Sequence, residues 1–352
     1  MTIRFEERAP YERGFAAVFD RRIAPELERL EAERLRLKRR GRILFGAATA
    51  AGALVGIAFT PLAPDLAIGF LMVLFPFLFG AGIGAVLMFT TGDKWEAGLT
   101  DLVVPVVCDF VGNLEYDRDA AAGFPTDRMR KLGVIGGYDS VRVSDRLDGR
   151  YRNVSFALVE AALLERYWDH NDKRRTRTVW SGLLFQIGVP VSAPGRILVA
   201  QDAGDLLNRI TSWPAGDDGR GMPRVPFADD PRFEAAFEVH ADDPFAAVGF
   251  LDAGFREALL EIAEAESTRP GAKGVAAGFE GDDFFLALSR RGPFLSIGSI
   301  QRPVTDVAEE IHGVFDDLAV VFRIINRLHG DRPDTDPVPA GPSPGAPVAP
   351  AA

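Results

Sequence analysis

The chain has 352 residues, enough for more than one domain and for a sizeable hydrophobic core. Its formal net charge is −10, and an acidic protein is a poor ligand for nucleic acid because the phosphates repel it. A single cysteine, Cys108, excludes an intramolecular disulfide and a cysteine-rich metal site. We expect this cysteine to be a small buried hydrophobic residue rather than a reactive thiol.

The first 42 residues differ in charge from the rest. They contain 12 Lys/Arg and 8 Asp/Glu, whereas the remaining residues contain 28 and 42, a net charge of −14. The stretch from Pro25 to Arg42 is typical of a charged helix with proline in its first turn, and FAAVFDRRI before it can form a second short helix. We therefore predict a charged helical stalk over residues 1–42, which could be coiled-coil-like or pack on the rest of the chain.

Two stretches, 43–60 and 66–89, contain no charged residue. Each is close to the ~20 apolar residues that cross the hydrocarbon core of a bilayer, and only PLAPD separates them. The sequence therefore predicts a transmembrane helical hairpin over residues 43–89. Small residues recur one turn apart and would let the two backbones approach closely, although this spacing also arises by chance. These residues are Gly52, Gly56, Gly80 and Gly84.

Positive charge is concentrated on one side of the predicted hairpin, and the turn at 61–65 has neither Lys nor Arg. The basic residues directly before the first span are Arg34, Arg36, Lys38, Arg39, Arg40 and Arg42. The positive-inside rule places the N-terminus in the cytoplasm, and two spans return the C-terminus to the same side. Trp95 is expected to mark the lipid–water interface. The lipid bilayer is therefore the first expected partner.

Residues 90–330 are expected to form a cytoplasmic domain of antiparallel strands and helices, so the fold class is α+β. DLVVPVVCDFV, at 101–111, is too short to span a bilayer and is interpreted as the first buried segment of this domain. Alternating apolar residues predict strands around 141–143, 154–158, 183–189 and 197–199. DRLDGR, at 145–150, is predicted to be the turn between the first two of these strands.

The C-terminal part is predicted to contain a helix over 252–266, a hairpin within GFEGDDFFLALSRRGPFLSIG, and a long helix from Thr305 to His329. The long helix has a heptad seam, formed by Val307, Ile311, Val314, Leu318, Val321, Ile325 and Leu328. The seam fits a helix docked on its own sheet, which we favour, or a partner helix. Residues 202–230 are predicted to form a loop, and the proline-rich tail 331–352 is predicted to be disordered.

The chain carries none of the common phosphate-loop, dinucleotide, zinc-protease or hydrolase motifs. His170 and His240 have acidic neighbours but not the regular spacing of a metal site, and Glu160 and Glu165 could approach each other on a helix. We assign no catalytic, cofactor-binding or metal-binding residue and expect no cofactor.

Two groups of surface or core residues have alternative interpretations. DKRRTR, at 172–177, is interpreted as an exposed hairpin arm, or else as a docking patch for an acidic partner. Four phenylalanines are expected to fill the core, although they could line an aromatic groove instead. They are Phe233, Phe237, Phe245 and Phe250.

Four phrases of the sequence resemble the bacterial membrane-protein family DUF3137. They are IAPELERLEAERL, WSGLLFQIGVPVSAPGRILVAQD, DPRFEAAFEVHADDPFAAVGFL and GFEGDDFFLALSRRGPFLSIGSI. The resemblance extends over nearly the whole chain up to Gly330 and implies a fold family without an assigned activity. No functional residue is carried over.

Together these features predict a binding or scaffold protein in the bacterial cytoplasmic (inner) membrane, with two spans and both termini in the cytoplasm. Its expected partner is another protein or a second copy of itself, and not nucleic acid. Two alternatives remain open. One is a membrane-tethered enzyme whose site is built from scattered acids, and the other is a structural homo-oligomer joined through the stalk or the last helix.

Overall fold

The computed structural model describes most of the chain. The described residues are 3–62, 64–118, 123–170, 172–201, 221–268, 272, 274–290 and 297–328, with the backbone alone over 87–94. The predicted tail at 331–352 lies outside them, as does most of the predicted loop, residues 202–220.

Contacts divide the chain into two compact units, each assembled from separate stretches. Unit 1 comprises Met1–Arg8, Glu12–Val107 and Ser296–Gly313. Unit 2 comprises Ala9–Tyr11, Cys108–Leu295 and Val314–Ala352. The division of the sequence at residues 42, 89 and 330 stays a prediction.

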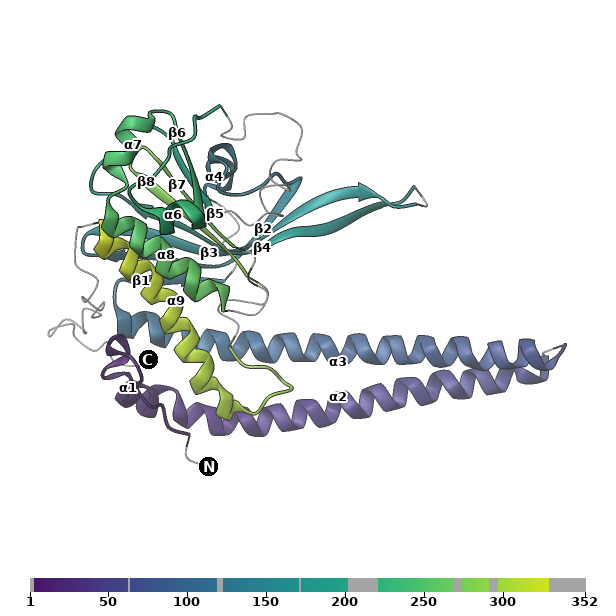
Figure 1. The fold of residues 1–352 in the computed structure, drawn as a ribbon. Helices are drawn as coiled ribbons and strands as arrows, with labels where there is room; N and C mark the ends of the chain where they lie inside the picture. Colours follow the sequence, from purple (N-terminus) through teal and green to yellow (C-terminus); the bar gives the residue numbers. More distant parts are fainter. Residues whose placement is uncertain are drawn as a thin grey trace. The chain divides into compact units, whose positions relative to one another are not determined.

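Two long helices dominate unit 1 (Figure 1). Its elements are α1 (Phe15–Arg22), α2 (Ala24–Phe59), η2 (Thr60–Leu62) and most of α3 (Leu66–Val111). Helix α2 has a proline in its first turn, as predicted, and continues without a break from the charged stretch into the apolar one. The short helix predicted upstream is confirmed as α1.

Helices α2 and α3 pack against each other through the small residues that the sequence singled out. The glycines at this contact are Gly52, Gly56, Gly80 and Gly84. A Cβ atom on Gly52 would stand 2.1 Å from the carbonyl oxygen of Pro76, and one on Gly80 would stand 2.3 Å from that of Ala48. Any larger residue at these positions would force the backbones apart, so the predicted role of the glycines is confirmed.

Arg34 and Trp95, which flank the predicted spans, are both buried within unit 1. Arg34 is only 5% exposed, pairs with Glu31 at 2.6 Å, and donates a hydrogen bond to the carbonyl oxygen of Ile300. Trp95 is 4% exposed and packs beneath Gly298. The expectation that Trp95 marks the lipid–water interface is therefore wrong, because the indole ring is covered by protein.

The segment DLVVPVVCDFV proves to be the last turns of α3, which runs through Pro105 to Val111. The side chains of Val103, Val104, Val107 and Cys108 are buried, as expected of this segment. Burial is the main cause that raises the pKa of the Cys108 thiol to about 12, with a further contribution from the charge of Asp109. The thiol is therefore protonated and unreactive at neutral pH, in agreement with its predicted role as a small buried hydrophobic residue.

Unit 2 contains an eight-stranded antiparallel sheet with the order β1-β2-β3-β4-β8-β7-β5-β6. The strands are β1 (Leu114–Asp117), β2 (Ser140–Tyr151), β3 (Val154–Trp168), β4 (Arg174–Gly188), β5 (Ile197–Gln201), β6 (Phe237–Ala241), β7 (Gly274–Glu280) and β8 (Asp283–Ser289). The antiparallel strands and the α+β class are thus confirmed, and so is the hairpin predicted around Gly281.

The turn predicted at DRLDGR is wrong, because these residues belong to β2. Asp145 has φ 49 and lies in an irregular stretch of the β2–β3 pairing, between Ser144 and Leu147. Such a bulge uses the same short polar residues as a turn. The chain reverses instead at Arg152 and Asn153, whose φ values of 50 and 66 fit the type I′ turns that join tight hairpins.

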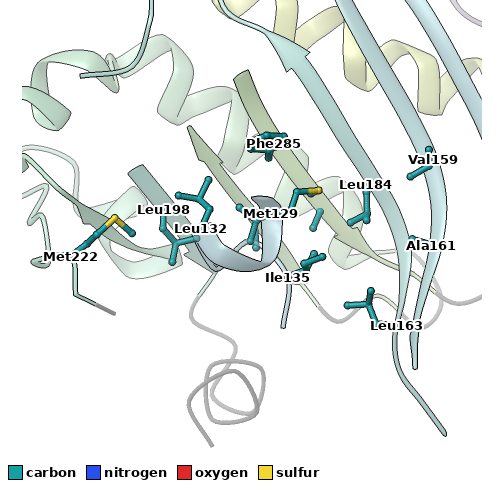
Figure 2. Packing of buried hydrophobic residues seen from close by; sticks show 13 residues of the cluster. Met129, Leu132, Ile135, Val159, Ala161, Leu163, Leu184, Leu198, Met222 and Phe285 are labelled. Atoms are coloured by element: carbon teal, nitrogen blue, oxygen red, sulfur yellow. The ribbon is translucent and has the colours of Figure 1, made fainter. Parts of the chain in front are cut away.

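Helices cover both faces of the sheet. They are α4 (Thr126–Leu132), α6 (Pro231–Ala236), α7 (Pro244–Phe250), α8 (Ala253–Ser267) and α9 (Val307–Leu328), the last preceded by η3 (Val304–Asp306). On one face, Phe255 of α8 contacts Phe279 and Phe284, and Phe322 of α9 contacts Phe156. On the other face, α4 directs Met129 and Leu132 toward the strands (Figure 2).

The heptad seam of α9 is buried by the chain itself. Leu318, Val321 and Ile325 are each no more than 1% exposed, and the aromatic contacts of Phe322 join the helix to β2 and β3. The interpretation of this helix as docked on its own sheet is therefore confirmed over the described side chains, which exclude that of Leu328.

The glycine contact between α2 and α3 predicts different effects at two neighbouring positions. Gly80→Leu should destabilise the helix pair by about 1–3 kcal/mol, because the added side chain meets the backbone of α2. Gly82→Leu is the matched control, since a Cβ on Gly82 would have no heavy atom within 4 Å. Thermal unfolding of the full chain in detergent micelles should show a lower midpoint for the first variant alone. Equal midpoints for the two variants would contradict the packing described here.

Candidate interaction surface

Few large apolar side chains of unit 2 are exposed among the described residues. They are Tyr167, Trp168, Val191, Phe245 and Val248. Phe245 is 92% exposed, so its expected place in the core is wrong. The other three phenylalanines of that prediction do pack: Phe233 and Phe237 are buried, and Phe250 contacts Phe279 with ring centroids 5.0 Å apart.

Tyr167 and Trp168 lie on a two-stranded ribbon that projects beyond the rest of the sheet (Figure 1). Residues 165–168 of β3 pair with residues 174–177 of β4, whereas β2 first pairs with β3 at Leu164 and β8 with β4 at Gly182. We call residues 165–177 the arm. DKRRTR forms one side of it, and its exposure confirms the interpretation of this segment as an exposed hairpin arm.

Side chains on one face of the arm are joined to one another. Arg175 pairs with Asp169 at 2.8 Å, and Arg177 pairs with Glu165 at 2.7 Å. The guanidinium of Arg177 also lies over the ring of Tyr167, with its central carbon 5.6 Å from the ring centroid. We call this the paired face. Because its charges are neutralised locally, it offers little to a charged partner.

The opposite face of the arm carries Arg166, Trp168, Arg174 and Thr176, and we call it the open face. The pairing register puts Trp168 opposite Arg174 and Arg166 opposite Thr176, and residues opposite each other in an antiparallel pair point to the same side. Trp168 is 70% exposed. Neither arginine side chain forms a hydrogen bond or an ion pair within the part of the chain that the structure describes. Two free guanidinium groups thus flank an exposed indole.

The acids and histidines considered in the sequence are dispersed. Glu160 and Glu165 both lie on β3, so the suggestion that they meet on a helix is wrong; five residues apart, they point to opposite faces of the strand. His170 is exposed in the turn of the arm, while Nδ1 of His240 lies 3.2 Å from the carbonyl oxygen of Met222. Among the described residues, no three His, Cys, Asp or Glu side chains gather as metal ligands would. The prediction of no cofactor stays a prediction.

A buried cluster of charged side chains in unit 2 joins two helices to the sheet. Arg290, at the end of β8, binds Glu266 of α8 through two hydrogen bonds and Asp317 of α9 at 2.5 Å. Burial acts to lower the pKa of Arg290, but the hydrogen bonds and charges of the two carboxylates outweigh it and raise that pKa. The arginine is therefore charged, and its planar guanidinium ties two helices to the sheet.

A second buried pair lies in unit 1. Nδ1 of His312 is 2.6 Å from Oε1 of Glu12, and the ring of Phe5 stacks on the imidazole with centroids 4.4 Å apart. Sequence reasoning missed this pair, because 300 residues separate its members. Both side chains are less than 10% exposed, so the pair holds the N-terminal segment in place rather than facing a ligand.

Removal of the central cation should destabilise the Arg290 cluster strongly. Arg290→Ala leaves Glu266 and Asp317 without their shared arginine, a change that costs about 3–5 kcal/mol for buried pairs. The midpoint of thermal unfolding should fall by on the order of 10 °C. Arg232→Ala is the control, because Arg232 is 70% exposed, and its contact with Glu257 is worth about 1 kcal/mol or less. A similar small shift in both variants would show that the cluster does not hold α8 and α9.

Comparison with known proteins identifies a family for part of the chain. A family described as a protein of unknown function, DUF3137, matches residues 178–329, from β4 to the end of α9. The crystal structure of the mycobacterial trehalose monomycolate transport factor A, TtfA, is similar at 11% identity and a TM-score of 0.28, over 60% of this chain and 88% of that one. No curated protein matches the chain. Residues 178–329 thus match the family that the sequence resemblance suggested, and the resemblance of the residues before 178 stays a prediction.

Proposed function

We propose that this protein is a membrane-anchored binding protein. In this proposal, α2 and α3 cross the bilayer as a hairpin, and unit 2 is presented to a partner protein on the side of the N-terminus. The observation that carries the proposal is the exposure of the two long apolar helices. Each contains an 18-residue window apolar enough to cross a membrane, and only 6% of each window is buried within the structure.

The apolar side chains around the helix pair support the anchor. Leu54, Leu66 and Phe79 are 67%, 94% and 73% exposed, although leaving such a side chain in water costs about 1.5–3 kcal/mol. A soluble core helix would bury these groups against protein. In hydrocarbon they need no protein cover, and the glycine contact supplies the packing that holds helices together there.

The distribution of positive charge supports a cytoplasmic location for both ends of the chain. Arg36, Arg39, Arg40 and Arg42 are exposed immediately before the apolar part of α2, whereas the connection at 60–65 contains no Lys or Arg. This asymmetry favours retention of the N-terminal side in the cytoplasm. A bacterial inner membrane is the setting that the DUF3137 resemblance suggests.

The use of polar groups in unit 2 favours binding over catalysis. The buried carboxylates of Glu266 and Asp317 are both bonded to Arg290, and the carboxylates of Asp229 and Asp230 are bonded to Arg256. Four of the five exposed large apolar side chains of unit 2, by contrast, lie on the arm and on α7. Self-association through the seam of α9 is not favoured, because that seam is buried within the chain.

Labelling of introduced cysteines tests the anchor and its orientation. Because Cys108 is buried and unreactive, single cysteines can be added at Leu62, 70% exposed between the helices, and at Val191, 66% exposed in unit 2. In intact spheroplasts, an impermeant maleimide should label Leu62→Cys at once and Val191→Cys only after permeabilisation. The opposite pattern would reverse the orientation. Release of the protein by alkaline carbonate would end the proposal of a membrane anchor.

A photo-crosslinking residue at Phe245 tests the binding role. Phe245 lies on α7 with Val248 exposed one turn away, so a partner that covers this surface should give a discrete adduct in intact cells. Arg232, which is 70% exposed on α6, is the control position and should give none. The adduct should also be lost in Val248→Asp. A partner that plays this role must appear in stoichiometric yield, and equal adducts at the two positions would refute specific binding here.

A further inference from the structure

We propose that the open face of the arm binds the anionic headgroup region of a membrane. The residues that make this contact are Arg166, Trp168 and Arg174, and the ligand groups are lipid phosphates. The inference rests on the proposed anchor, because the anchor is what keeps the arm near a bilayer. It adds a second membrane contact, made by the sheet of unit 2 rather than by the two apolar helices.

The residue types on the open face fit the headgroup layer. Tryptophan is enriched at the lipid–water interface, where its apolar ring and its N–H group both find suitable surroundings. A guanidinium can donate two parallel hydrogen bonds to one phosphate, and its stem can lie along apolar surface. Arg174 stands directly opposite Trp168, and Arg166 lies two residues before Trp168 on the same strand. All three side chains therefore reach one surface together.

The charge of the arm contrasts with that of its surroundings. Residues 165–177 contain five Lys/Arg and three Asp/Glu, although residues 43–352 as a whole carry a net charge of −14. Two of the three acids, Glu165 and Asp169, are bonded to arginines of the paired face. The positive charges that remain are those of Arg166 and Arg174 on the open face and of Lys173 in the turn. The charge of Lys173 offsets that of Asp172, so the net positive charge of the arm lies on the open face.

The size of the open face favours a lipid surface over a partner protein. Stable protein interfaces bury about 800 Å² on each partner, whereas a ribbon four residue pairs long extends only ~13 Å. Such a patch is too small to hold a free protein. It suffices for a chain already tethered to a bilayer, because tethering raises the effective concentration of headgroups to the millimolar range or above.

The test uses the full chain in lipid nanodiscs with an environment-sensitive NBD label on a single added cysteine. The label at Thr176→Cys reports on the open face and leaves Trp168 and both arginines intact. The label at Tyr167→Cys reports on the paired face of the same ribbon. Phosphatidylglycerol added to phosphatidylcholine should raise and blue-shift the emission at residue 176 alone. Equal responses at the two positions, or none at either, would overturn the proposal.

Charge removal on each face provides the decisive comparison. Arg166→Gln with Arg174→Gln should lower the ratio of bound to free arm about fivefold for each arginine, or about 25-fold for the pair. Arg175→Gln with Arg177→Gln removes the same charge from the paired face. Because the glutamine amides can still donate hydrogen bonds to Asp169 and Glu165, this variant should lower the response of residue 176 much less than the open-face variant does. Arg166→Lys with Arg174→Lys should retain most of it, which separates loss of charge from loss of arm structure. An unchanged response in the first variant would refute the role of the two arginines.

Two further observations keep this proposal separate from the proposed function. Incorporation of the chain into nanodiscs reports on α2 and α3, so failure to incorporate would count against the anchor and not against the arm. If the chain incorporates but a photo-crosslinker at Thr176 in intact cells captures a protein instead of lipid, the arm is a protein-binding element. That result would overturn the assignment to headgroups while leaving the membrane anchor intact.

Discussion

The close approach of α2 and α3 at four glycines is the constraint on which unit 1 depends. In the proposed membrane setting, no hydrophobic driving force acts between apolar helices, so contact area and backbone proximity must supply the association. Pro76 contributes to this contact in an indirect way. Because proline has no N–H group, the carbonyl oxygen of Met72 loses its helical partner, and this oxygen lies 2.8 Å from the place where a Cβ on Gly56 would stand. The exposed carbonyl and the glycine therefore occupy the same part of the interface.

The same helices also organise the polar end of unit 1. Ile23, directly before α2, and Leu27 near the start of α2 are both fully buried, and the helix reaches the apolar stretch without a break. Between these two parts, Arg34 is held by Glu31, whose second oxygen also accepts the N–H group of Val304. The Arg34 hydrogen bond lowers the pKa of Glu31, so this ion pair is stable at neutral pH. One continuous helix thus joins a core packed by protein to a surface suited to lipid.

In unit 2, a charge placed at the junction of three elements fixes their arrangement. A buried ion pair adds little net stability, because desolvation offsets the attraction, but its geometry admits few alternatives. The backbone of Arg290 also forms two hydrogen bonds with Ser181 of β4. The backbone of this residue therefore binds a neighbouring strand, while its guanidinium binds the two helices. The close approach of β4 and β8 at this point requires Gly182, where a Cβ would stand 2.0 Å from the carbonyl oxygen of Leu288. Helices α8 and α9 are therefore positioned relative to the central strands by a few specific atoms.

Local patterns sufficed to predict elements whose signal lies within one stretch. The charge-free runs, the glycine pairs, α8 and the seam of α9 are of this kind, since each reflects the periodicity of a single helix. The errors involve contacts between distant residues or ambiguous residue types. Trp95 is covered by Gly298, which follows it by about 200 residues, and the Asp and Gly of DRLDGR suit a bulge as well as a turn.

The sequence alone could not predict which residues of the arm share a face, because this depends on the pairing register of the two strands. A slip of one residue in register exchanges the faces of a strand, and the pairing of β3 with β4 contains an irregularity between Leu163 and Leu164. DKRRTR predicted exposure and positive charge but not which arginines would be neutralised. Only the register places Arg174 beside Trp168 and Arg177 beside Glu165.

The paired face contains internal side-chain contacts and the open face does not, and this difference follows from the marginal stability of a two-stranded ribbon in water. Without a core beneath it, the arm must be held by contacts between its own side chains, each worth about 0.2–1 kcal/mol. Glu165, Tyr167, Asp169, Arg175 and Arg177 supply such contacts on one side. A ribbon stabilised on one face can leave the other free of internal pairs. The exposed Trp168 and its two flanking arginines are thus available for an external surface without weakening the structure that presents them.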